Sequence, residues 1–336
     1  MELPRHEEFD RVFDPEGDLI LRVGGAGGSY SDQPAHYRVC SATLRRTRII
    51  PSSKPQTVSE SVLNSVRLGS DRVTFCSLPE NYKIGMEVVL AILHGNFDSL
   101  PKRPSTFVLY AIVTTAEKYE LNHLIRPWAK DWFLSSVVPR WITTSEERFQ
   151  KIYLAWQLGS EAVFVSEALV LVLQSAVNKR GWLAHQFPDT QRSIRLKDFD
   201  FGFPGFSAEI RYIRDSLFDR MLSTYHDHLQ ECGTSLGPSG DLEHRYRTTT
   251  EIPHPLPKTA NDLPNESVSS LLKSIQGGPM RLAFPCVPGH EGCVTDQRFG
   301  LMEKKVRGEG ERMLRIALLA GNYGEEMKKR REYFGV

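Results

Sequence analysis

The stretch from Leu78 to Phe133 decides the fold of this chain. It reads LPENYKIGMEVVLAILHGNFDSLPKRPSTFVLYAIVTTAEKYELNHLIRPWAKDWF. Apolar residues recur in it at spacings of three and four positions, which is the period of an amphipathic helix. The pattern predicts three helices, which are Ile84 to His94, a second that opens near Pro104, and Leu121 to Phe133.

Short breaks separate these predicted helices. Gly95 ends the first because glycine takes positive φ angles readily, and Pro104 opens the second. The second helix, which includes Phe107 and Tyr110, is apolar nearly all round, so we expect it to be deeply buried. Pro127 kinks the third helix unless it lies in the first turn, because proline removes a backbone donor.

Strand-like segments precede and follow a glycine-rich run near the start of the chain. Phe13 to Val23 alternates mostly as a strand does, and Arg72 to Leu78 does the same further on. The run from Gly24 to Gly28 lacks the Lys-Ser or Lys-Thr pair of a phosphate-binding loop. We therefore expect a flexible turn between two strands there.

Taken in order, these motifs resemble a fungal BTB/POZ domain. The run ILHGNFDSLP, the helix ending AEKYEL and the helix containing LIRPWAKDW resemble its second half. Gly17 to Val23 and His36 to Val39 resemble its first two strands, and Cys40 to Leu44 resembles the start of its first helix. The resemblance implies a small sheet flanked by helices, and a protein-interaction module rather than an enzyme.

After Leu44 the sequence departs from that family, whose members continue into a second short helix. Here Arg45 to Pro55 is polar, basic and broken by prolines. We expect a solvated loop, because no aromatic residues interleave with the basic ones to stack bases. The alternative is contact with an acidic partner or RNA. A short helix is expected over Val58 to Leu68.

Composition limits the classes of function. The 336 residues leave room for two domains of about 100–200 residues. Lys and Arg number 42 and Asp and Glu 41, a formal net charge of +1, so no global attraction to nucleic acid or to an anionic membrane follows. The cysteines are scattered and the N-terminus does not read as a signal peptide, so we expect a cytoplasmic or nuclear location.

Helical patterns continue beyond Leu134. Ser145 begins a helix that Gly159 ends, and Glu161 to Val177 follows as a buried helix, too short and too often interrupted by polar residues to cross a bilayer. The pair resembles the helical extension that follows BTB domains in many relatives. Asn178 to Gly205 reads as an aromatic-rich loop that packs onto the helices, or alternatively offers a docking face for a peptide.

The remaining sequence predicts one strong helix and then loss of order. Glu209 to Gln230 has helical spacing, whereas Cys232 to Asn265 has the composition of a linker. Short helices are expected at Val268 to Ile275 and at Met313 to Ala320. The tetrad Lys328 to Arg331 is either a nuclear address or a charged helix tail.

The expected organisation is therefore α+β, with a BTB/POZ-like domain, a helical extension and a partly disordered C-terminal region. The expected divisions are a flexible lead-in over residues 1–12, the BTB/POZ-like domain over 13–134, the helical extension over 135–231, and a low-order linker and C-terminal region with short helices over 232–336.

One constellation has the spacing of metal ligands. Cys286, His290 and Cys293 lie on a Gly- and Pro-rich stretch and could form three corners of a zinc tetrahedron. A fourth ligand would have to come from elsewhere, and an ordinary loop with two free thiols is the alternative. No serine-nucleophile elbow, zinc-protease motif or complete phosphate loop is present, so we expect no enzyme and no cofactor other than this zinc.

The function that the resemblance implies is protein–protein interaction, with a second copy of the chain or a cullin scaffold of a ubiquitin ligase as partner. A membrane partner is not expected, and nucleic acid is not favoured. Alternatives are a nuclear transcription or chromatin regulator and an enzyme without a recognisable motif. The candidate interaction residues are Leu44, Ile84, Val88, Leu109 and Tyr119.

Overall fold

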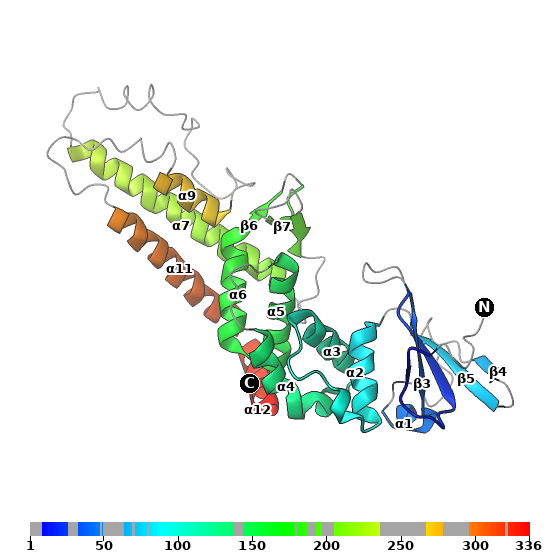
Figure 1. Cartoon of the computed structure of the whole chain (residues 1–336). Coiled ribbons are helices and arrows are strands. Elements are labelled where there is room, and N and C mark those ends of the chain that lie inside the picture. Colours follow the sequence, from blue (N-terminus) through cyan, green and yellow to red (C-terminus); the bar gives the residue numbers. More distant parts are fainter. Residues whose placement is uncertain are drawn as a thin grey trace. The chain divides into compact units, whose positions relative to one another are not determined.

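The computed structural model shows an α+β protein in which a small mixed sheet with helices is followed by a mostly helical remainder (Figure 1). The residues that it describes are 9–25, 33–47, 49, 64–68, 71–78, 81–137, 144–178, 180–186, 193–196, 205–235, 267–277, 296–319 and 322–336. The chain divides into two compact units. Unit 1 consists of Met1–Thr143, Gln157–Gly159 and Arg330–Val336, and unit 2 of Thr144–Trp156 and Ser160–Lys329.

Unit 1 contains a five-stranded sheet in the order β1-β3-β2-β5-β4. The strands are β1 (Arg11–Val12), β2 (Leu19–Val23), β3 (Ala35–Val39), β4 (Asn64–Leu68) and β5 (Asp71–Leu78). Strand β2 lies at the centre, antiparallel to β3 and parallel to β5, with Leu19 opposite both Val39 and Thr74. Leu19, Ile20 and Leu21 are all buried, as expected for a central strand covered on both faces.

The helices of unit 1 are α1 (Ser41–Arg46), α2 (Lys83–Leu93), the 3-10 helix η1 (Phe97–Ser99), α3 (Thr106–Lys118) and α4 (Asn122–Ser136). The three helices predicted between Leu78 and Phe133 are thus confirmed, with ends that differ by a few residues. The Ser105 side chain accepts a hydrogen bond from the Val108 amide and so caps α3. Gly95, at φ +73°, follows the end of α2.

Helices α2 and α3 approach each other at a residue that has no side chain. A Cβ atom on Gly85 would lie 2.2 Å from the Ala111 carbonyl oxygen and 2.5 Å from the Thr115 hydroxyl. Real Cβ atoms essentially never come that close, so only glycine fits here. The contact places the first turn of α2 directly on the middle of α3.

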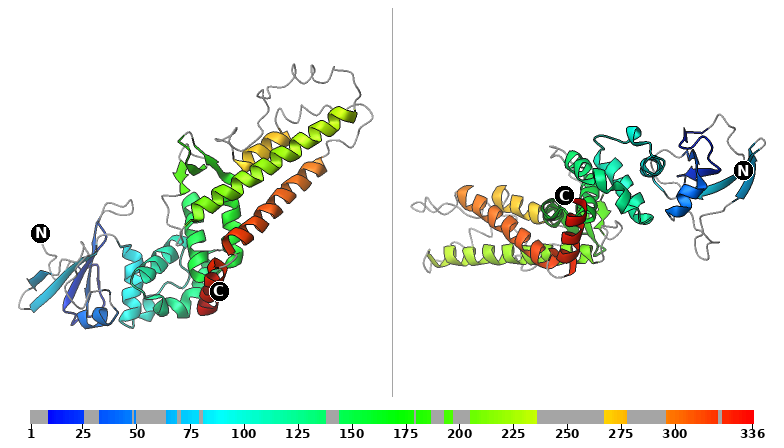
Figure 2. Two further views of the ribbon diagram at one scale, coloured as in Figure 1. Left: turned by 180° about the vertical axis from the view of Figure 1, so that it is seen from behind. Right: turned by 90° about the horizontal axis from the view of Figure 1, so that it is seen from below.

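Unit 2 is mostly helical. Its elements are α5 (Ser145–Leu158), α6 (Glu161–Gln174), β6 (Ser175–Val177), β7 (Leu183–Gln186), β8 (Ser193–Arg195), α7 (Phe206–Ser235), α9 (Val268–Gly277), α11 (Asp296–Leu319) and α12 (Asn322–Phe334). The strands form an antiparallel sheet in the order β6-β7-β8. Helices α7, α9 and α11 pack against α6, and α7 and α11 lie side by side (Figure 2). From Arg330 onward, α12 belongs to unit 1.

Aromatic rings and ion pairs hold unit 2 together. Phe164 on α6 contacts the rings of Trp156 on α5 and Phe206 on α7, at centroid distances of 6.0 Å and 5.9 Å. Helix α11 is joined to its neighbours by ion pairs at its surface, from Glu309 to Arg220 on α7 and from Arg315 to Glu161 on α6. Exposed ion pairs contribute little, so the buried aromatic contacts dominate this packing.

The helix predicted over Val58 to Leu68 is wrong for the part that the structure describes. Asn64–Leu68 forms strand β4, which pairs with β5 so that Val66 lies opposite Val73. Its few apolar residues favour a helix only weakly, and pairing with the neighbouring strand β5 outweighs that preference. The predicted loop from Asn178 to Gly205 likewise contains β7 and β8.

Three predicted helix boundaries also need correction. The helix expected to reach Val177 ends at Gln174, because the chain continues as β6 and pairs with β7. The helix expected from Glu209 to Gln230 is longer and is α7. The short helix expected at Met313 to Ala320 is the C-terminal part of α11, which has 24 residues. Gly308 and Gly310, which weaken the helical signal in isolation, lie within α11.

The Gly85 contact yields a stability prediction. Gly85→Ala should lower the free energy of unfolding by about 1–3 kcal/mol, because the new methyl group must push α2 away from the α3 backbone. Gly308→Ala is the matched control, since a Cβ there meets nothing within 4 Å. The control should be neutral or stabilising by up to about 1 kcal/mol. Urea unfolding of both variants measures the effect, and equal stability of the two would contradict the contact.

Candidate functional site

The five candidate interaction residues occupy different environments in unit 1. Leu44, Val88 and Leu109 are buried in the core, at 0%, 7% and 0% exposure. Ile84 is 37% exposed on the first turn of α2, and Tyr119 is half-buried after α3, with Lys118 over its ring. The structure therefore does not bring the five side chains together on one surface. Their role in an interaction stays a prediction.

Ile84 is two positions after Tyr82, which belongs to an aromatic group that the sequence did not indicate. Tyr82, 37% exposed, precedes α2 and makes edge-on contacts with Phe107 and Tyr110 of α3 at centroid distances of 6.0 Å and 5.9 Å. Phe107 and Tyr110 are themselves half-buried. We call Tyr82, Ile84, Phe107 and Tyr110 the α2–α3 patch.

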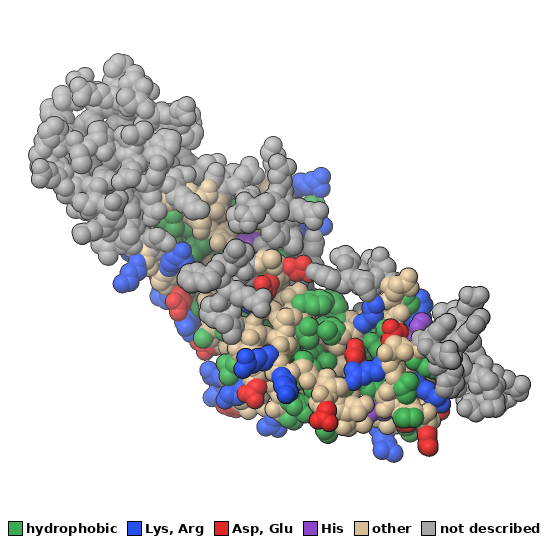
Figure 3. All heavy atoms as spheres, in the orientation of Figure 1, with side chains coloured by type: hydrophobic (Ala, Val, Ile, Leu, Met, Phe, Trp, Pro, Cys, Tyr) green, Lys and Arg blue, Asp and Glu red, His purple; other side chains and the backbone are tan. Residues whose placement is uncertain are grey.

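The deep burial predicted for the whole second helix is wrong on one side of α3. Leu109, Ile112 and Ala116 face the core, whereas Phe107 and Tyr110 are three positions apart and share a partly exposed face. The spacing of these two aromatics could have indicated that face. Figure 3 shows hydrophobic side chains reaching the visible surface of unit 1 near α3, between groups of charged side chains.

A second aromatic group lies between η1 and α4. Phe97 is 54% exposed and contacts Trp128 at 5.8 Å, and Trp128 stacks on Trp132 at the same centroid distance. Trp132 is buried and donates a hydrogen bond from Nε1 to the Pro101 carbonyl oxygen at 2.7 Å. This group thus runs from the surface into the core and anchors the η1 loop on α4, which is a structural role.

Hydrogen bonds hold α1 and α2 against the sheet. The Asp18 carboxylate accepts bonds from the backbone N–H and the hydroxyl of Ser41 at 2.7 Å and 2.6 Å. Burial raises the pKa of Asp18, but the Ser41 hydrogen bonds outweigh this and hold the pKa below its ordinary value. The His94 ring accepts from the Cys40 amide through Nε2 and lies 2.9 Å from the Leu90 carbonyl through Nδ1. These hydrogen bonds join the start of α1 to Asp18 and to the end of α2.

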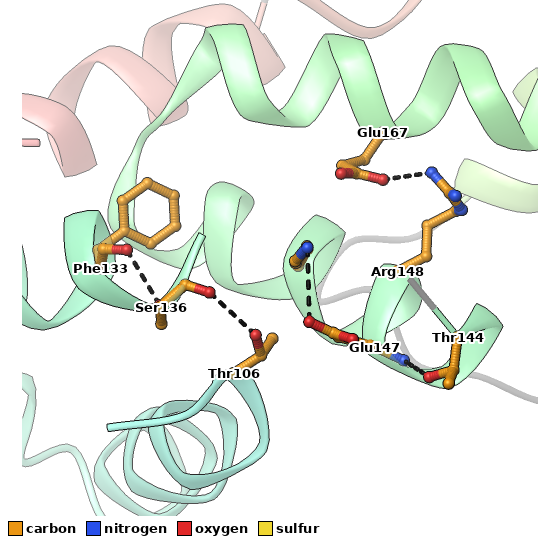
Figure 4. Close-up of polar contacts among 8 residues, drawn as sticks. Thr106, Phe133, Ser136, Thr144, Glu147, Arg148 and Glu167 are labelled. Atoms are coloured by element: carbon orange, nitrogen blue, oxygen red, sulfur yellow. Dashed lines mark hydrogen bonds and ion pairs between the residues drawn. The ribbon is translucent and has the colours of Figure 1, made fainter. Parts of the chain in front are cut away.

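The start of α3 and the end of α4 are joined in the same way. The Thr106 hydroxyl donates to the Ser136 carbonyl oxygen at 3.1 Å (Figure 4). Both side chains are buried, so the bond is shielded from water. On the sheet side, Arg11 forms an ion pair with Glu87 of α2 at 2.5 Å. This pair is partly exposed and contributes at most about 1 kcal/mol.

Unit 2 holds a cluster of buried and partly buried titratable groups. Arg148 on α5 pairs with Glu167 on α6 at 2.5 Å (Figure 4). Lys151 lies 3.5 Å from Glu147, one turn earlier on α5. His185 on β7 is 2% exposed and contacts the ring of Phe149 at 6.0 Å. Burial, and to a smaller extent the charge of Arg148, lowers the pKa of His185 to about 4. The imidazole is therefore neutral at pH 7.

These groups join elements rather than line a site at the surface. The Arg148–Glu167 pair connects α5 to α6, and the buried Arg214 on α7 donates from Nε to the Ser175 carbonyl oxygen on β6 at 3.0 Å. Arg214 is deeply buried and therefore costly to leave unpaired, whereas the Arg148–Glu167 pair is partly exposed. The alternative of an enzyme without a recognisable motif stays a prediction.

The candidate zinc ligands Cys286, His290 and Cys293 lie outside the described residues. Within the described ranges, no group of three or more His, Cys, Asp and Glu side chains could hold a metal ion. Cys76 is 1% exposed, and burial raises the pKa of its thiol to about 11, which makes it unreactive at neutral pH. This supports the interpretation of Cys76 as a small buried hydrophobic residue.

The basic tetrad lies on helix α12. Lys328, Lys329 and Arg331 are exposed, whereas Arg330 is half-buried and donates a hydrogen bond to the Gln157 side chain. The reading as a charged helix tail agrees with this placement, and its use as a nuclear address stays a prediction.

None of the helices among the described residues is long and apolar enough to cross a membrane. Comparisons of the chain with protein-family models, with curated proteins and with solved structures found no match.

The buried imidazole predicts how stability depends on pH. The unfolded chain binds a proton at His185 below about pH 6.5, whereas the folded chain does not until about pH 4. Stability should therefore fall as the pH drops from about 6.5 to 4, by roughly 3 kcal/mol from this group. His185→Gln should flatten that part of the profile. Urea unfolding at a series of pH values tests this, and identical slopes for the two proteins would contradict it.

Proposed function

We propose that this chain is a non-enzymatic protein-interaction module of the BTB/POZ type and that a second copy of the chain covers its α2–α3 patch. The observation that carries the proposal is the patch itself. Tyr82, Ile84, Phe107 and Tyr110 are partly exposed on a framework that has a buried core. Aromatic and aliphatic residues that stay at the surface of a packed framework are typical of the centre of an interface.

The order of the elements supports the BTB/POZ part of the proposal. Strands β2 and β3 form an antiparallel pair that leads directly into α1, and β5 returns parallel to β2 before helices α2, α3 and α4. These are the segments that carry the resemblance, in the same order. Strand β4 lies in the region where the sequence departs from the family, so an interface there would differ from that of the family.

The charge balance supports association with a second copy. With a formal net charge of +1, two copies of the chain repel each other very little. Tyr82 and Phe107 are rigid side chains that lose little conformational entropy when an interface forms. A symmetric dimer brings the same patch of both copies together, so each aromatic group would meet an apolar surface.

Light scattering of the full chain over a wide range of concentrations tests the proposal. The wild-type chain should associate, and Ile84→Asp should weaken the association by at least about tenfold, because it buries a charge in the interface. Leu134→Asp is the matched control, since Leu134 is an exposed aliphatic residue of unit 1, at 55%, outside the patch. It should associate as the wild type does. Circular dichroism verifies that both variants are folded.

A pull-down of the same proteins with a cullin scaffold identifies the alternative occupant. If the wild-type chain is a monomer that binds the scaffold, and Ile84→Asp but not Leu134→Asp abolishes this binding, the partner at the patch is the scaffold and not a second copy. Equal association of Ile84→Asp and wild type would contradict the role of the patch. A monomeric wild type that captures nothing would contradict the interaction module itself.

A further inference from the structure

The end of helix α12 is packed closely against a residue of unit 1 that has no side chain. Gly159 follows α5 at φ +83°, and a Cβ atom on it would lie 2.1 Å from the Arg331 backbone nitrogen and 2.5 Å from the Arg331 Cα atom. Real Cβ atoms essentially never come that close, so the helix can lie here only against glycine. Gly159 and the residues of α12 from Arg330 onward all belong to unit 1.

Side chains on both sides of this contact also hold the end of the helix. Arg330 donates a hydrogen bond to the side chain of Gln157, which is buried. Arg126 of α4 lies over the ring of Tyr333, 4.7 Å from its centroid. We give the name α12 docking site to Gln157, Gly159 and Arg126.

The basic tetrad Lys328 to Arg331 lies on the stretch of α12 that reaches this docking site. Successive side chains of a helix are about 100° apart around its axis, so four consecutive ones cannot all face one binding groove. In an extended chain, by contrast, alternate side chains point to the same side. A partner can therefore recognise the tetrad as one contiguous basic motif only after this part of α12 has left the docking site and unwound.

The intact helix also places carboxylates near the tetrad. Glu325 and Glu326 precede it and Glu332 follows it. Lys328 and Lys329 each have at least two of these carboxylates three or four positions away, and residues at that spacing are neighbours on a helix surface. In an extended chain, residues three positions apart are about 10 Å from each other. Unwinding thus separates the cations of the tetrad from the carboxylates and aligns them.

We propose that the α12 docking site controls a nuclear address. While α12 is docked, the tetrad is the charged tail of the helix, where cations are favourable because of the helix dipole. When the last turns of α12 leave the docking site, the tetrad becomes an extended basic segment that binds the acidic groove of a nuclear import receptor. Each interpretation of the tetrad thus belongs to one state of the helix. The proposal does not depend on the α2–α3 patch.

Release of the helix end is a local opening of the structure. Such openings at the ends of elements require less free energy than global unfolding, so a fraction of the molecules is released at equilibrium. The receptor binds only that fraction, which raises its apparent dissociation constant by the inverse of the fraction. Variants that weaken docking should therefore bind the receptor more tightly.

Binding of the full chain to a purified nuclear import receptor tests the proposal. Gly159→Ala should lower the apparent dissociation constant by about tenfold or more, because the new methyl group pushes the Arg331 backbone away and raises the released fraction. Gly205→Ala is the matched control, since Gly205 has the same φ angle of +83° and a Cβ there meets nothing within 4 Å. It carries the same backbone strain and should bind within about twofold of the wild type.

Two double variants complete the test. Tyr333→Ala with Phe334→Ala removes side-chain contacts of α12 beyond the tetrad and leaves α5 unchanged. It should also bind the receptor more tightly, so the test does not depend on the folding of a single variant. Lys328→Gln with Lys329→Gln, added to either releasing variant, should abolish the gain, because these exposed side chains belong to the address and not to the docking contact.

Hydrogen exchange at the Arg331 amide measures release independently of the receptor, and it should be faster in both releasing variants than in the wild type. Three results would overturn the proposal. The first is equal receptor binding by the wild type and by the releasing variants although their Arg331 amide exchanges faster. The second is a gain that persists after the two lysines are replaced, and the third is no receptor binding by any of the proteins.

Discussion

Helix α2 can lie against helix α3 because residue 85 is a glycine. A side chain there would collide with the backbone of Ala111, so the distance between the helices is set by one missing methyl group. The close approach has consequences on both sides of the contact. Inward it packs Val89 and Ile112 into the core, and outward it allows Tyr82 to reach Phe107 and Tyr110. The α2–α3 patch is therefore a product of the same contact that holds unit 1 together.

Much of unit 1 could be predicted from its sequence because the breaks in it have clear local causes. Gly95 follows α2 at a positive φ angle and Ser105 caps α3, so the helices between Leu78 and Phe133 are delimited by residues with few other options. Strand β4 and the sheet of unit 2 could not be predicted in this way. Their pairing depends on partners elsewhere in the chain, which a short run such as Ser193–Arg195 does not reveal.

The candidate site was less accessible to sequence reasoning than the fold. Apolar spacing identifies which residues are hydrophobic, but the exposure of Phe107 and the burial of Leu109 depend on which neighbour covers each side of α3. Ile84 is among the predicted interaction residues, whereas Tyr82 is not. Tyr82 lies before the helix, and only its ring contacts with α3 identify it as part of the patch. The contact of Gly159 with Arg331 likewise joins segments that are far apart in the sequence.

The central claim is that a second copy of the chain covers the α2–α3 patch, and hydroxyl-radical footprinting tests it most directly. The oxidation rates of Tyr82, Phe107 and Tyr110 would be compared with those of exposed Tyr212 at concentrations below and above the association midpoint. We predict that the three patch residues become protected on association while Tyr212 keeps its rate. Association that leaves the oxidation rate of Tyr82 unchanged would contradict the claim, because the copies would then meet through another surface.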